Sequence, residues 1–223
     1  MKRFIVGLDL GQAQDWTALA IVELVQPPTP APEKVTSPPT VVPRPATEFH
    51  LRHLERVKLG TPYPDIVKRV HQLLHTSQLR GQSELVVDAT GVGRPVVDLL
   101  QQAGLHPTAV TITSGDSESW DRGDYRVPKR DLVVGLQVLL ELGRLKVAEG
   151  LEEWPTCLRE LLAFKVKIDP LTAHDSYGYA REGIHDDLVL AVALACWRIR
   201  KADSAPSYDG IENIVIPWPT RHR

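Results

Sequence analysis

Residues 4–11 read Phe-Ile-Val-Gly-Leu-Asp-Leu-Gly, and residues 17–25 read Thr-Ala-Leu-Ala-Ile-Val-Glu-Leu-Val. Both stretches are apolar and rich in β-branched residues, which favours buried strands. The short polar turn between them predicts an antiparallel hairpin. Residues 47–57 alternate well enough between apolar and polar side chains to predict a third strand. These three strands are the first part of the predicted sheet.

Beyond residue 57 the pattern alternates between helices and strands. Helices are expected at 64–77, 94–103, 128–142, 151–163 and 185–201, strands at 84–88, 108–113 and 144–148, and a hairpin at 164–180. The polar stretch 114–127 is expected to be a loop. Parallel strands need a helical crossover between them. The order therefore predicts an α/β fold: a mixed sheet of five or more strands, the first three antiparallel, with helices on both faces.

The sequence predicts one globular domain, residues 1–204, and a loosely structured tail, residues 205–223. Residues 26–46 hold eight of the chain's 18 prolines and are expected to form a mobile loop inserted between strands. The two cysteines show no zinc spacing. No apolar run is long enough for a signal sequence or a membrane helix, so an intracellular protein is expected. The net charge of −2 indicates no overall basic field for nucleic acid.

Three carboxylate sites lie far apart in the chain. Asp9 ends the first strand, Asp88 ends strand 84–88, and Asp186-Asp187 open the last helix. In sheets of this kind, functional groups collect at the carboxyl ends of the strands. Carboxylates are costly to bury unpaired, so their convergence indicates a bound cation. Helical spacing leaves open which of Asp186 and Asp187 points inward, and each aspartate could instead cap a turn or a helix.

Aspartate oxygens suit Mg²⁺ or Mn²⁺, and a pair of such ions can drive the cleavage of a phosphodiester. Competing chemistries lack their motifs. The sequence Asp-Ala-Thr-Gly-Val-Gly at 88–93 is neither a P-loop nor a dinucleotide fingerprint, and no Gly-x-Ser-x-Gly or His-Glu-x-x-His occurs. A basic cluster interleaved with Trp120 and Tyr125 would suit DNA phosphates and bases, although a solvated surface explains its members equally well. Its basic residues are Arg122, Arg126, Lys129 and Arg130.

Taken together, these motifs resemble the nuclease domain of tailed-phage terminase large subunits. The similar segments are 7–11 (Gly-Leu-Asp-Leu-Gly), 87–93, 127–130 (Val-Pro-Lys-Arg) and 185–189 (His-Asp-Asp-Leu-Val). The resemblance implies an RNase H-like (resolvase-type) fold and a metal-dependent endonuclease that cuts concatemeric double-stranded DNA during genome packaging. It implies Asp9, Asp88 and Asp187 as catalytic metal ligands, with Asp186 as a neighbour or additional ligand. Leu190 stands where many relatives carry a further acid.

The resemblance also implies partners: a terminase ATPase motor, the portal and the small terminase, in the cytoplasm of a bacterial host, with the gene borne by a phage or prophage. No Walker A motif occurs in this sequence, so the motor would act from elsewhere in a longer protein or from a second one. Three alternatives stay open. They are a nuclease similar to Holliday-junction resolvases, an actin-like sugar kinase, and a packaging or DNA-binding module without catalysis.

Overall fold

The fold was analysed in a computed structural model of the 223-residue chain. It describes residues 2–11, 15–28, 46–91, 93–121, 123–168, 175–179 and 185–204. Most of the proline-rich stretch (29–45), the tail (205–223) and Arg122 therefore lie outside the described residues, as do the expectations made for them. Among the described residues, no helix combines the length and the apolar composition needed to cross a bilayer.

An eight-stranded mixed sheet forms the centre of the molecule, with the order β6-β7-β5-β4-β1-β2-β3-β8. Its strands are β1 (Phe4–Asp9), β2 (Thr17–Val25), β3 (Glu48–Val57), β4 (Ser83–Asp88), β5 (Thr108–Thr113), β6 (Ser119–Asp121), β7 (Asp124–Pro128) and β8 (Leu145–Val147). As the sequence predicts, β1, β2 and β3 pair antiparallel, while β4 runs parallel to β1 and β5 parallel to β4. A separate pair, β9 (Phe164–Ile168) and β10 (Asp175–Tyr179), forms the expected hairpin.

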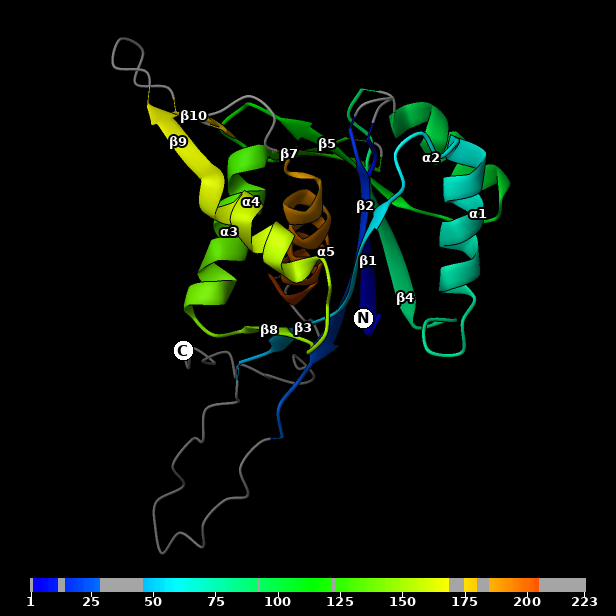
Figure 1. Cartoon of the computed structure of the whole chain (residues 1–223), viewed down its shortest axis with the longest axis horizontal. Helices are drawn as coiled ribbons and strands as arrows, with labels where there is room; N and C mark the ends of the chain where they lie inside the picture. Colours follow the sequence, from blue (N-terminus) through cyan, green and yellow to red (C-terminus); the bar gives the residue numbers. More distant parts are fainter. Residues whose placement is uncertain are drawn as a thin grey trace, which may run out of the picture.

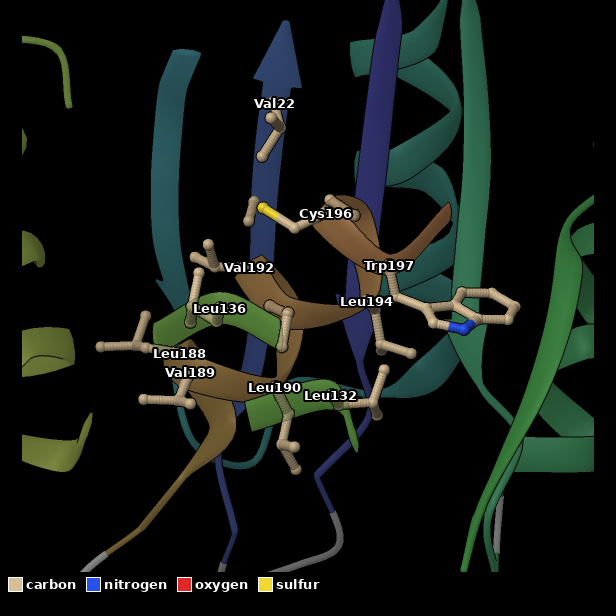
Figure 2. Packing of buried hydrophobic residues seen from close by; sticks show 14 of the residues in the cluster. Val22, Leu132, Leu136, Leu188, Val189, Leu190, Val192, Leu194, Cys196 and Trp197 are labelled. Atoms are coloured by element: carbon tan, nitrogen blue, oxygen red, sulfur yellow. The ribbon is translucent and has the colours of Figure 1, made fainter. Parts of the chain in front are cut away.

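Helices cover both faces of the sheet, which confirms the expected fold class. Helices α1 (Tyr63–Leu74) and α2 (Gly93–Gln102) lie on one face, and α3 (Lys129–Glu141), α4 (Trp154–Ala163) and α5 (Asp187–Ser204) on the other (Figure 1). Each face has its own apolar core. In the larger core, Leu132 and Leu136 of α3 and Val22 of β2 surround α5 (Figure 2). Helix α5 is thus enclosed between the sheet and a second helix layer.

A glycine lets α5 approach the sheet at very short range. A Cβ atom added to Gly7 of β1 would collide with the carbonyl oxygen of Ala191 in α5 and lie 3.1 Å from the Ala195 nitrogen. The small side chains of Ala191, Ala193 and Ala195 permit the same approach from the helix side, and all three are buried. This packing fixes the beginning of α5 relative to the end of β1.

The expectation of a loop at 114–127 is wrong. The stretch contains β6 and β7, and β7 extends the sheet by pairing parallel with β5. Its sequence, Asp-Tyr-Arg-Val-Pro, gives too short an alternation to stand out, and only Val127 and Pro128 are buried. Pairing with β5 supplies the stability that the local sequence does not indicate.

Candidate active site

The first two carboxylates meet at one edge of the sheet. Asp9 is the last residue of β1 and Asp88 the last of β4, and the register of these parallel neighbours ends with Leu8 opposite Val87. The next residue of each strand is the aspartate, so both carboxyl groups leave the sheet at the same point. The structure brings together the pair that the sequence analysis expected there.

Asp9 and Asp88 share a hydrogen bond. Burial raises the pKa of Asp9 well above its usual range, and the charges of Asp88, Asp187 and Asp186 raise it further. Burial also raises the pKa of Asp88, against the opposing effect of hydrogen bonds from Thr90, whose backbone nitrogen lies 2.8 Å from Asp88 Oδ1. The bond between the two carboxyl groups raises the pKa of Asp9 and lowers that of Asp88. Burial and the neighbouring negative charges thus both disfavour the ionised form of Asp9.

The first turn of α5 supplies the other two carboxylates, and each is held by a cation. The Lys129 ammonium group, at the start of α3, pairs with Asp186. The Arg56 guanidinium group, at the end of β3, lies 3.5 Å from Asp187 Oδ2. Asp187 is buried, and burial raises its pKa to about 6 despite the opposing charge of Arg56. The charges of Asp88, Asp186 and Asp187 thus all act on Asp9.

A fifth acid, Glu160 of α4, lies beside this cluster. It is 4% exposed, it pairs with Arg56, and its Oε2 accepts a hydrogen bond from the Val189 backbone N–H at 3.2 Å. Burial raises its pKa to about 7, while Arg56 and the Val189 bond act in the opposite direction. The sequence analysis missed both Glu160 and Arg56. A signal existed for Glu160, because it shares one helix face with Cys157 and Leu161, both buried.

The donor set fits a divalent metal ion. Asp9 and Asp88 offer hard oxygen ligands at the ends of neighbouring strands, and a cation there would neutralise the charges that raise the pKa of Asp9. Within the described part of the chain, no three acidic, histidine or cysteine side chains are already arranged to hold a metal. Asp186 now pairs with Lys129, and Asp187 with Arg56. To bind a metal ion, these two carboxylates would have to leave their cationic partners.

The members of the expected basic cluster lie in different environments. Arg126 is exposed on β7, whereas Arg130 lies near acids, 3.6 Å from Asp116 and 3.4 Å from Asp131. Lys129 lies inside the acidic cluster instead of on an outer basic surface. Trp120 of the edge strand β6 is 64% exposed. A candidate DNA surface therefore consists of Arg126 and Trp120 at the sheet edge.

A pocket of about 460 Å³ opens two residues beyond Asp9. The turn after β1 forms one wall and the connection between β3 and α1 forms the other, with Gly11, Asp15, Lys58 and Tyr63 among the lining residues. The Tyr63 hydroxyl donates to the Gly11 carbonyl at 3.3 Å and joins the two walls. The pocket thus lies next to the end of β1, with the cation Lys58 in its wall, and none of the four clustered aspartates lines it.

Solved structures with a similar fold include nuclease domains of large terminases. The large terminase nuclease of the thermophilic phage G20c is 21% identical, with a TM-score of 0.56 over 87% of this chain and 81% of that chain. A mutant nuclease domain of the large terminase subunit of bacterial virus Sf6, with manganese and beta-thujaplicinol, is 13% identical, with a TM-score of 0.57 over 87% of each chain. The Mn-soaked terminase nuclease domain of human cytomegalovirus is 12% identical, with a TM-score of 0.50 over 92% of this chain and 86% of that chain.

No protein-family model matches this sequence, and no curated protein matches it either. At these levels of identity, the structural similarity establishes the fold: the chain has the fold of terminase nuclease domains. The resemblance found in the four sequence motifs is confirmed at that level.

Proposed function

We propose that this protein is a metal-dependent endonuclease that cuts double-stranded DNA, of the kind found in large terminases. The observation that carries the proposal is the convergence of Asp9, Asp88 and the Asp186–Asp187 pair at one end of the sheet. A fold that gathers three carboxylates around a buried fourth has a large cost in free energy unless a cation joins them. One of the similar structures contains manganese, and another was soaked with it.

The roles of the residues follow from their positions. Asp9 and Asp88 would hold Mg²⁺ or Mn²⁺ between the strand ends, with Asp187 completing the set from α5 and Asp186 beside it. Two bound ions of this type supply an activated water and stabilise the leaving oxygen in an in-line cleavage. Thr90 orients Asp88 by donating two hydrogen bonds, from its nitrogen and from its hydroxyl, to the same oxygen, Oδ1. The second oxygen of Asp88, Oδ2, is then available to a cation that Asp9 also binds.

In this proposal DNA approaches along the turn after β1, next to the carboxylate cluster. The pocket beside Asp9, with Lys58 in its wall, can receive a sugar-phosphate segment, and Arg126 can contact a phosphate further along the sheet edge. Arg130 is proposed as a further DNA contact, and so is Arg122, which lies outside the described residues. In this proposal residues 1–204 are the nuclease domain, and a terminase motor, portal and small terminase are its partners in the cytoplasm of a bacterial host.

The test uses purified protein with supercoiled plasmid. We expect nicking and linearisation with Mn²⁺ or Mg²⁺, no cutting with EDTA, and loss of cutting in Asp9→Ala and Asp88→Ala variants that remain folded. Intact plasmid across a range of protein and metal concentrations would refute the proposal. A four-way junction included as a substrate separates this activity from junction resolution, which would cut the junction in preference to the linear duplex.

A further inference from the structure

We propose that Glu160 is a positioning residue of the metal site, acting on Asp187 through Arg56 and through the first turn of α5. The inference rests on the proposed function, since it assigns the presentation of one of that site's ligands to a residue on a different helix. Glu160 touches none of the groups that would contact DNA. It comes from α4, which is remote in sequence from all four aspartates.

The first line of argument concerns the guanidinium group of Arg56. The same nitrogen, Nη2, contacts Glu160 closely and Asp187 at 3.5 Å, so the cation is drawn towards Glu160. Trp16 confines the group from another direction, with its ring centre 5.4 Å away. Arg56 Nε is buried and has no hydrogen-bond partner among the described residues. The position of Arg56 is thus set by Glu160, which keeps the cation from closing fully on Asp187.

The second line concerns the helix that carries Asp187. Asp187 is the first residue of α5, so the Val189 N–H belongs to the turn whose donors have no partner within the helix. Glu160 Oε2 accepts that hydrogen bond, which makes it a cap supplied by a neighbouring helix. A carboxylate at a helix N-terminus is also favoured by the helix dipole. One side chain therefore fixes both the start of α5 and the cation beside Asp187.

The third line is the cost of the arrangement. A buried ion pair is often no more stabilising than apolar residues of the same volume. Glu160 adds a charge that is repelled by Asp187 and Asp186, as the upward effect of both on its pKa indicates. Despite this repulsion, both contacts of Glu160, to Arg56 and to the Val189 N–H, act on the segment that carries Asp187, as a role in orienting a metal ligand requires. Residues that orient metal ligands typically change metal affinity or activity about 10–100-fold when mutated.

The structure offers a matched control. Glu23 of β2 is also 4% exposed and also pairs with arginines, Arg3 and Arg52. It lies opposite Phe4, near the start of β1, whereas Asp9 is the last residue of that strand. Glu160→Gln and Glu23→Gln make the same change in two equally buried glutamates, although the arginine partners of Glu23 are more exposed than Arg56. Only the first change is predicted to affect the metal site.

The experiment titrates each purified variant with Mn²⁺ alone, followed by electron paramagnetic resonance, and records thermal melting without metal. We expect Glu160→Gln to weaken Mn²⁺ binding at least about tenfold, because Arg56 is then left with Asp187 as its acidic partner and competes for it. Glu23→Gln should bind Mn²⁺ as the wild type does. In plasmid cutting, Glu160→Gln should lower kcat and leave the KM for DNA unchanged. Glu160→Met, which fills the same volume without charge, replaces the glutamine variant if that variant does not fold.

Two different failures can be told apart. A wild-type protein that binds no Mn²⁺ would refute the proposed function itself. A wild-type protein that binds Mn²⁺ and cuts DNA, with Glu160→Gln matching Glu23→Gln in affinity, would refute only the positioning role. In that case, a lower melting temperature of both variants would identify Glu160 as part of the structural framework alone.

Discussion

Gly7→Ala tests whether the close contact between β1 and α5 builds the site. The added Cβ atom would overlap the Ala191 carbonyl oxygen and lie 3.1 Å from the Ala195 nitrogen, so it meets backbone that no side-chain rotation can move. The helix itself has to shift. Overpacking of this kind costs about 1–3 kcal/mol. For a chain of this size that corresponds to a fall in melting temperature of about 2–12 °C.

The same shift should also damage the site, because α5 carries Asp187 and β1 carries Asp9. A displacement of about 1 Å in a catalytic constellation can lower the rate about 100-fold. We therefore expect Gly7→Ala to lose both melting temperature, measured by calorimetry, and Mn²⁺ affinity, measured by titration. The matched control is Gly115→Ala, where the nearest atom to a new Cβ, Thr113 Oγ1, lies 3.7 Å away. If Gly7→Ala melted and bound Mn²⁺ like the control, the close contact would not determine the site.

Further predictions concern the acids and their cations. Burial raises the pKa of Asp187 to about 6 and of Glu160 to about 7, so the folded state holds protons that the unfolded chain releases. Without metal, the melting temperature should therefore fall as the pH rises from about 5 to about 8; a rise over that interval would contradict the assignment. Lys129→Ala should tighten Mn²⁺ binding, because the ammonium group no longer pairs with Asp186; weaker DNA binding with unchanged Mn²⁺ affinity would instead make it a phosphate contact. Asp9→Asn should raise the metal-free melting temperature, because the amide is buried without charge, while Mn²⁺ binding is lost; calorimetry and titration measure the two effects.

Much of the architecture could be predicted because local pattern and tertiary environment agree. The apolar runs that end in Asp9 and Asp88 are buried strands, and strands that run parallel place their last residues side by side. The relative position of these elements follows from strand direction, which the order of strands and crossover helices indicates.

The rest depends on contacts that no local pattern encodes. Strand β7 exists because β5 offers it hydrogen bonds, and its own five residues are too few to indicate a strand. Arg56 ends an alternating strand like any surface arginine, and only the fold brings it to Asp187. The sequence likewise places Lys129 in a basic cluster, but its ammonium group turns to Asp186 across the space between α3 and α5. Charge partners are set by distance in space, which the sequence does not give.

The contact between β1 and α5 has a consequence for the order in which the protein acquires its activity. Asp9 belongs to the first strand and Asp187 to the last helix of the described residues, so α5 is synthesised after β1. Protein synthesis adds only about 5–20 residues per second, and contacts between distant segments form late. Until α5 has emerged and packed against Gly7, the nascent chain lacks one side of the acidic cluster. Copies of the protein that end before α5 would therefore lack the proposed DNA-cutting activity.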